Sequence, residues 1–348
     1  MFPELFLNHL LDNVIKSSGV EELSKNPVSA QLVSWAFRNI KDVQTLEKIC
    51  RSIEWDKFHY NIMSTGIVLK NLFSKVIDVQ ANDHLKWPED IVHDFAMFVY
   101  EDIESFKNDV EKHSILVLIM ELTCGFEPDT LFNSKKLTFQ MGHKSIEESM
   151  KKYVVLRDIP QQYSKLAKIF AKDFIEDVDD SDIPKMIKEA ARLFQYMLIA
   201  LKMSNNSYSQ TFIRKILNPV MLQRGKLESF LVEPRDTRTI EMAILFADQK
   251  RLASVWRDSF GDNLNFFIEH PFANHLVTRI VESINDEDVF KKAFTDLAPN
   301  IEKIQQKRRC NIIIALSVKC KEWPNFQREF SDVSFYLFFS YFLSIFKF

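Results

Sequence analysis

Apolar residues recur along the chain at the spacing of one face of an α-helix. In the segment that begins at Asn274, counted as position 1, they occupy positions 3, 4, 7, 8 and 11, which fall on one side of a helix. Six further segments fit the same template, and they begin at Ala30, Gly66, His113, Ala191, Thr237 and Cys310. Across the seven segments 32 of the 35 positions are apolar, where a hydrophobic content of 46% would fill about 16; the exceptions are Thr123, Thr239 and Ser317. The pattern predicts seven amphipathic helices that each bury one face.

These helices follow one another with a period near 36 residues that is lengthened in places by insertions. Successive starts lie 36, 47, 78, 46, 37 and 36 residues apart, and a period near 36 residues is typical of stacked helical repeats. We therefore predict an all-α array of about seven to nine repeats over residues 1–325. The interval of 78 residues is expected to contain one degenerate repeat and an acidic loop near residues 173–184, which ends at Pro184. The aromatic-rich residues 326–348 are predicted to be an atypical C-terminal tail.

The composition limits the classes of protein that fit. The 348 residues include only six Gly, which disfavours glycine-rich phosphate loops, and the hydrophobic content excludes a disordered chain. The net charge of −3 argues against strong non-specific binding to duplex nucleic acid. The four cysteines show no C-x-x-C spacing, so we predict reduced thiols in the core of an intracellular protein.

Neither end of the chain has the pattern of a membrane segment. Near the N-terminus, Glu4 and Asp12 interrupt the apolar run and no basic segment precedes it, which is unlike a secretory signal. The uncharged stretch 333–346 is shorter than the roughly 18 residues of a spanning helix. We expect a buried terminal helix or an atypical terminus there, and no membrane partner; a membrane anchor is the alternative.

Three of the helical segments share a lead in which a proline stands just before the apolar stripe. They read HPFANHLVTRIVESI at 270–284, NPVSAQLVSWAFRNI at 26–40 and LVEPRDTRTIEMAI at 231–244. The first resembles the second helix of a Pumilio repeat. Together with HSILVLIMELTCG at 113–125 and QKRRCNIIIALSVKC at 306–320, their order is similar to that in the nucleolar Pumilio-like proteins of the nucleolar-protein-nine type. The resemblance is firm over 231–320 and looser over 23–201, and the family is longer at its C-terminus.

The resemblance implies a fold, a partner and a location. The fold is an α-α superhelix, a solenoid of Pumilio-like repeats curved around a concave RNA-binding face. The implied partners are single-stranded or structured RNA, namely precursor ribosomal RNA, and proteins of the pre-ribosomal particle, bound by a monomer in the nucleolus. The implied role is a non-catalytic one in small-subunit ribosome biogenesis and pre-rRNA processing, without a cofactor.

Residues that contact RNA can be assigned from the same resemblance. In Pumilio repeats the side chains at positions 1 and 5 of this helix contact a base edge, and the side chain at position 2 stacks between bases. Carried over to this chain, the pattern gives edge contacts to Thr237, Glu241, Asn274, Thr278, Gln195 and Ser34, and stacking to Arg238, His275, Arg192 and Gln31. The basic cluster Lys307, Arg308 and Arg309 is expected to contact phosphates.

Several repeats depart from that pattern. Position 5 is Lys70, Val117 or Ile314 in three of the segments, and position 2 is Ile67 in one of them. Aliphatic side chains do not read a base edge, so a code of one base per repeat does not run through the array. Recognition by shape, stacking and phosphate contacts, with only a few bases read, is expected instead.

Each assigned residue also has an ordinary structural interpretation. Asn274 would cap a helix, Arg238 and Glu241 would form a surface ion pair, and the cluster at 307–309 would be a solvated helix start. Two other functions stay open for the whole chain. One is a messenger-RNA regulator of the better-known Pumilio type, and the other is a helical scaffold that binds proteins.

Motifs for catalysis are missing from the sequence. There is no G-x-S-x-G nucleophile elbow, and no H-x-x-x-H pair comes with a third ligand. Glu54, Asp56 and His59 are interpreted as surface groups. Cys124, at a helix end, is interpreted as a packed thiol, the alternative being a thiol with a lowered pKa. We predict neither an enzyme nor a metal site.

Overall fold

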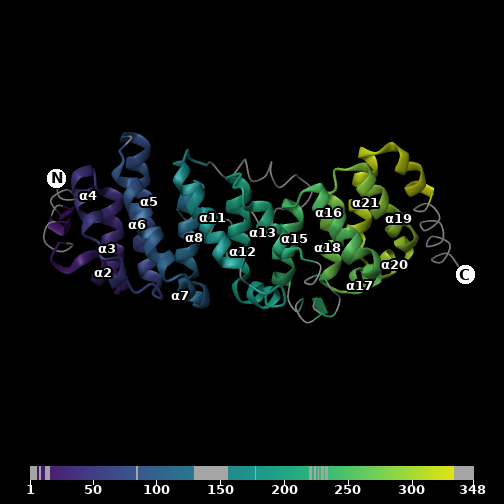
Figure 1. The fold of residues 1–348 in the computed structure, drawn as a ribbon, viewed down its shortest axis with the longest axis horizontal. Coiled ribbons are helices and arrows are strands. Elements are labelled where there is room, and N and C mark those ends of the chain that lie inside the picture. Colours follow the sequence, from purple (N-terminus) through teal and green to yellow (C-terminus); the bar gives the residue numbers. More distant parts are fainter. Residues whose placement is uncertain are drawn as a thin grey trace, which may run out of the picture. The chain divides into compact units, whose positions relative to one another are not determined.

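The computed structural model describes residues 6–7, 9–11, 16–83, 85–128, 156–176, 178–218, 222, 225, 227–228, 231 and 234–332. Every regular element in these ranges is a helix, which confirms the all-α prediction (Figure 1). The chain forms two compact units. Unit 1 comprises Met1–Phe174 and Ile199–Ser207, and unit 2 comprises Ile175–Leu198 and Tyr208–Phe348.

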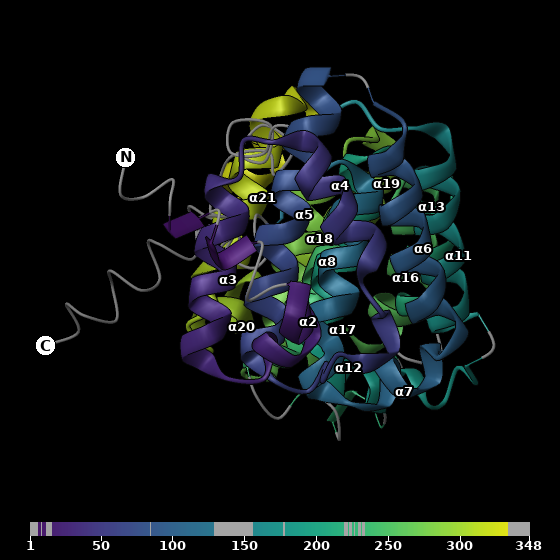
Figure 2. The same cartoon turned by 90° about the vertical axis from the view of Figure 1, so that its left-hand side faces the viewer.

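Unit 1 is a stack of helix pairs. Its helices are α2 (Lys16–Ser24), α3 (Pro27–Asn39), α4 (Val43–Ser52), α5 (Met63–Asp83), α6 (Trp87–Glu101), α7 (Ile103–Asn108), α8 (His113–Cys124) and most of α11 (Gln161–Ile175). In each repeat, the second helix is the one that carries the apolar stripe of the template. In the first three repeats it is α3, α5 and α8, respectively. Helix α3 packs along α5, and α5 packs against α8 (Figure 2).

Unit 2 repeats this arrangement. It contains the first part of α12 (Ile183–Met203), followed by α13 (Ser209–Ile216), α15 (Pro234–Phe246), α16 (Gln249–Val255), α17 (Leu264–Glu269), α18 (Ala273–Ser283), α19 (Glu287–Leu297), α20 (Ile301–Gln306) and α21 (Cys310–Glu322). The second helices α15, α18 and α21 pack in sequence order, each against the next.

The predicted apolar stripe is the core of both units. The seven second helices place 31 of the 35 stripe residues in the buried class, and the exceptions are Leu32, Ala247, Ile313 and Ser317. Two of the three polar residues in the stripe are buried with hydrogen bonds. Thr123 Oγ1 donates to the Ile119 carbonyl at 2.7 Å, and Thr239 Oγ1 donates to the Ala191 carbonyl at 3.3 Å. The hydroxyls therefore fit the core because their donors are satisfied.

Side-chain caps explain where many helices begin. Asn26 Oδ1 accepts from the Val28 N–H at 2.8 Å, and Pro27 stands at the first turn of α3. Three aspartates act in the same way: Asp42 caps α4, Asp248 caps α16 and Asp286 caps α19. Short side chains with acceptor oxygens satisfy backbone N–H groups that have no partner within the helix.

The abundant phenylalanines form clusters of packed rings between repeats. Phe260 and Phe267 stack with ring centroids 4.1 Å apart and an interplanar angle of 11°, and Trp256 stacks on Phe260 at 5.7 Å. The Trp256 indole donates to Asp296 at 2.9 Å. In unit 1, Phe73 and Phe95 pack 4.8 Å apart. These rings fill the core with few rotatable bonds to immobilise.

The acidic segment is partly a structural element. Helix α11 ends at Ile175 and α12 begins at Ile183, so Pro184 lies in the first turn of α12 rather than at the end of the loop. Asp180 accepts hydrogen bonds from Lys215 Nζ at 3.3 Å and from the Asn218 amide group. It thereby links the loop to the end of α13 instead of being only solvated. Asp177 and residues 129–155 lie outside the described residues, so that only part of the 78-residue interval in which a degenerate repeat is predicted is described.

The cysteines are free thiols with different environments. Cys50, Cys124 and Cys320 are buried, as predicted. The prediction is wrong for Cys310, which is exposed because it is the first residue of α21 and lies off the apolar stripe. Burial raises the pKa of Cys124 to about 12, so this thiol stays protonated at neutral pH and the packed-thiol interpretation is confirmed.

The C-terminal region continues the packing beyond the predicted boundary at 326. Residues 324–332 are helical, and Phe326 is buried against Phe290 and Phe294 at 5.2 and 5.3 Å. The uncharged stretch 333–346 lies outside the described residues. Within the ranges described, none of the helices combines the length and the apolarity that a bilayer crossing requires.

Candidate nucleic-acid interface

The proline lead positions the start of a second helix. His270 Nδ1 accepts hydrogen bonds from the backbone N–H groups of Phe272 and Ala273 at 3.2 and 3.1 Å. It thereby caps the turn that leads into α18 from two residues before the N-cap residue, Phe272. Burial lowers the pKa of His270, a nearby Arg309 lowers it further, and Glu228 opposes the shift. The neutral imidazole is the form that caps α18, because only an unprotonated Nδ1 can accept.

We expect stability to depend on pH through this cap. The neutral His270 stabilises the fold above the ordinary histidine pKa near 6.5, and this contribution is lost as the pH falls through the lowered pKa of the folded state. The variant His270→Asn keeps an acceptor that does not titrate. Between pH 7 and 5, the wild type should lose about 1 kcal/mol more than this variant in urea unfolding. Equal losses would contradict the role of His270 as a cap.

The predicted stacking residues lie on the surface. Gln31 of α3, Arg192 of α12 and His275 of α18 are exposed, and Arg238 of α15 is half-buried. Three of these four positions, 192, 238 and 275, belong to unit 2, on second helices that follow one another along the chain. Position 2 of the template thus presents a guanidinium or an imidazole on three consecutive repeats.

The predicted edge-reading residues lie deeper. Ser34, Gln195, Thr237, Asn274 and Thr278 are buried, whereas Glu241 is half-buried. Some of them are held by hydrogen bonds within unit 2. Gln195 Nε2 donates to Thr239 Oγ1 at 3.2 Å, and Thr278 Oγ1 donates to the Asn274 carbonyl at 3.2 Å.

The side-chain amide of Asn274 is engaged in hydrogen bonds at the start of α18. Its Nδ2 donates to the carbonyls of His270 and Pro271 at 2.9 and 2.7 Å, which agrees with the helix-end interpretation of this residue. Ser34 Oγ has no hydrogen-bond partner among the described residues. The assignment of these buried side chains to base edges stays a prediction.

Glu241 takes part in an ion-pair network between two repeats. Its Oε2 lies 3.2 Å from Arg279 Nε, and Arg279 Nη1 lies 2.7 Å from Glu282 Oε2. The ion pair that the structure shows for Glu241 is therefore with α18 and not the one expected with Arg238. Arg279 and Glu282 were not selected by the sequence pattern, because Arg279 stands at position 6, next to the positions that the pattern uses.

The basic cluster before α21 divides into two parts. Lys307 and Arg308 are exposed, and Arg308 adopts a positive φ of 57° in the turn before the helix. Arg309 donates to the carbonyls of Ile268 and Glu269 at 3.4 and 3.2 Å, and so secures the end of α17. Phosphate contact by Lys307 and Arg308 stays a prediction, whereas Arg309 has a structural role.

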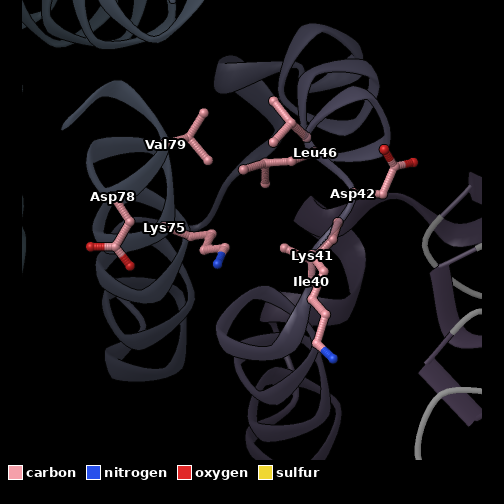
Figure 3. Close-up of a pocket in the computed structure, with 8 residues that line it drawn as sticks. Ile40, Lys41, Asp42, Leu46, Lys75, Asp78 and Val79 are labelled. Atoms are coloured by element: carbon pink, nitrogen blue, oxygen red, sulfur yellow. The ribbon is translucent and has the colours of Figure 1, made fainter. Parts of the chain in front are cut away.

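Possible metal ligands and hollows are further features of the described part of the chain. Within it, no three His, Cys, Asp or Glu side chains are grouped so that they could hold a metal ion. A hollow of about 130 Å³ lies between the α3–α4 connection and α5, where Figure 3 shows Lys75 reaching toward Ile40 and Lys41. Asp42 and Asp78 complete its charged lining. The volume holds a few water molecules and is too small for a nucleotide.

Comparison with known proteins assigns the repeats to a family. Residues 116–336 match the model of the NOP9-like PUF repeat domain. The chain belongs to this family. The match begins within α8 and covers all of the second helices that follow it, so the Pumilio-like identity of these repeats, predicted from their proline leads and apolar stripes, is confirmed.

Curated relatives of this NOP9-like PUF chain include three proteins called Nucleolar protein 9. The mouse protein is 25% identical over 106 residues, or 30% of this chain and 17% of the relative. The human protein is 24% identical over 100 residues, or 29% and 16%. The protein of Botryotinia fuckeliana is 21% identical over 178 residues, or 47% and 22%. The matched regions thus span about a fifth of each relative.

Solved structures confirm the fold. The structure of APUM23 with GGAGUUGACGG, whose uridines mark it as RNA, superposes with a TM-score of 0.67 over 94% of this chain and 61% of APUM23, at 11% identity. The structure of APUM23 with GGAUUUGACGG gives the same TM-score at 10% identity, over 94% of this chain and 60% of the other. At such identity the likeness establishes a solenoid of helical repeats.

Proposed function

We propose that this chain is a non-catalytic RNA-binding protein that holds single-stranded or looped RNA against the second helices of its PUF repeats. The observation that carries the proposal is the placement of Arg192, Arg238 and His275 at position 2 of three consecutive second helices, at or near the surface. Guanidinium and imidazole groups stack on unpaired bases of any identity. The complexes of APUM23 with RNA support the same use of the fold.

The RNA that we propose is precursor ribosomal RNA in the nucleolus. Support comes from the relatives called Nucleolar protein 9 and from the NOP9-like family model. Under this proposal the chain acts in small-subunit ribosome assembly and pre-rRNA processing, beside proteins of the pre-ribosomal particle. Aliphatic residues at position 5, such as Val117 and Ile314, agree with the reading of only a few bases.

Crosslinking in cells followed by sequencing of the bound RNA tests this proposal. The wild type is compared with the double variant Arg238→Ala, Glu241→Ala, and we expect precursor ribosomal RNA to be enriched at a discrete site that the variant loses. Loss of the partly exposed ion pair between Glu241 and Arg279 should lower the free energy of unfolding by no more than about 1 kcal/mol. Enrichment of messenger 3′ regions would instead indicate a regulator of the Pumilio type.

A protein-binding scaffold is the second candidate, and one feature of unit 1 favours it. Met63 and Val28 are 84% and 70% exposed, and Leu32 and Ile67 are 42% exposed. All four lie on the adjacent helices α3 and α5, and Ile67 occupies the stacking position of its repeat. An apolar surface of this kind is typical of a protein contact. Crosslinks at background level in cells would leave this function as the better account.

A further inference from the structure

The network of Glu241, Arg279 and Glu282 crosses from one repeat to the next. Glu241 is at position 5 of α15, and Arg279 is at position 6 of the neighbouring α18. The Nε of Arg279 contacts Glu241 Oε2 at 3.2 Å, while its Nη1 contacts Glu282 Oε2 at 2.7 Å. The side chains of Glu241, Arg279 and Glu282 are 16%, 21% and 25% exposed. The pair is therefore partly removed from water and still reachable from the surface.

The charges of the network support one another. Burial on its own would lower the pKa of Arg279, but the carboxylates of Glu282 and Glu241 outweigh this effect and raise the pKa. The planar guanidinium donates in fixed directions, so it holds the Glu241 carboxylate in one orientation. A carboxylate accepts several hydrogen bonds, and the bond from Nε leaves further acceptor sites on Glu241.

The geometry points to Arg279 as a positioning residue that sets base specificity through Glu241. This inference rests on the proposed function. Held by Arg279, the Glu241 carboxylate accepts hydrogen bonds from a base edge that carries adjacent donors, which among the four RNA bases is the N1–H and N2–H edge of guanine. The guanidinium also offsets the negative charge of Glu241, which would otherwise repel the phosphates of a bound strand.

The two other polar position-5 residues of unit 2 show why this role is particular to Glu241, the remaining one being the aliphatic Ile314. Gln195 is held by Thr239, and Thr278 is held by the carbonyl of Asn274 in its own helix. Both are neutral, so orientation by a hydrogen bond suffices for them. Glu241 carries a charge, and the guanidinium of Arg279 provides orientation and charge compensation together.

Selection from a randomised pool of single-stranded RNA, followed by sequencing, tests the inference on the full chain. We expect the wild type to enrich guanine at one position of its site. Affinities are then measured for the selected RNA and for the same RNA with adenine at that position. Arg279→Ala should reduce the preference for guanine about tenfold, because a well-formed bidentate contact contributes about that much discrimination. Arg279→Lys, which lacks the planar fork, should lose most of the preference.

Glu282→Gln is the matched control. This substitution removes the other carboxylate partner of Arg279 and leaves the contact between Arg279 Nε and Glu241. The melting temperature of the Glu282→Gln variant should therefore fall as in Arg279→Ala. Its preference for guanine should persist. A guanine preference that is unchanged in Arg279→Ala would overturn the inference and leave RNA binding intact. A wild type that binds no RNA from the pool would overturn the proposed function itself, and the two failures are thus distinguished.

Discussion

Replacing Arg192, Arg238 and His275 together by alanine is expected to lower RNA affinity at least about 100-fold. Each side chain stands at the stacking position of its repeat, and alanine substitution at a base-stacking contact removes about 1 to 3 kcal/mol. Three losses at the low end of this range amount to about 3 kcal/mol, and 1.4 kcal/mol corresponds to a factor of ten. Fluorescence anisotropy measures the dissociation constants of the wild type and the variant, with a labelled RNA of the sequence that crosslinking in cells identifies.

The control for this variant must remove similar charge from another part of unit 2. Lys250 of α16 and Lys291 of α19 are exposed on first helices of their repeats, and their double alanine variant removes two cations away from the predicted face. Its affinity should fall less than threefold, since only long-range attraction to phosphates is lost. Similar losses in the two variants would show that RNA binding depends on total charge and not on the second helices.

Thermal unfolding separates binding from folding in the same comparison. None of the three stacking side chains belongs to the apolar stripe, so the triple variant should melt within a few degrees of the wild type. A large fall in melting temperature would attribute the lost affinity to damage of the repeats. The three side chains would then be structural, and the face that binds RNA would have to be sought elsewhere.

The helices could be predicted from sequence because each repeat buries a fixed stripe. Of the residues at positions 3, 4, 7, 8 and 11, 31 of 35 are buried, so local periodicity is sufficient for most of the core. Partners between repeats are harder to predict. The 37-residue period places Thr278 opposite Glu241, whereas the side chain that reaches Glu241 is Arg279, 38 residues away. A long side chain can reach from a neighbouring position, and a one-residue offset lies beyond what the sequence pattern resolves.

Helix caps illustrate a second limit of sequence reasoning. Asn26 before Pro27 is a common type of cap and could be recognised from sequence, but His270 is neither a favoured capping residue nor at the N-cap position of α18, which is Phe272. The role of His270 depends on the imidazole turning Nδ1 toward two backbone N–H groups, which only the structure shows. Cys310 was misplaced for a related reason, since composition indicates that thiols are usually buried but does not state which helix face carries them.

Phe260→Ala is expected to destabilise unit 2 by about 3 to 5 kcal/mol, because it empties the centre of the ring stack formed with Trp256 and Phe267. Phe260 is fully buried between Trp256 and Phe267, in the π-helical turn Trp256–Phe260 that follows α16. No neighbouring side chain can fill the space without leaving its own contacts. Urea unfolding should therefore show a lower midpoint, and Phe266→Ala, at a half-buried ring on the same helix pair, should show a much smaller shift.

The location of the loss distinguishes a repeat protein from a single cooperative core. In a stack of repeats, each repeat is stabilised mainly by its contacts with the repeats next to it. Hydrogen exchange in Phe260→Ala should therefore lose protection in α16, α17 and α18, while α3 and α5 of unit 1 keep theirs. Equal loss of protection in α3 and α18 would contradict this. It would mean that the chain unfolds as one body, and that substitutions in unit 2 affect the apolar surface of α3 and α5 as strongly as the second helices of unit 2.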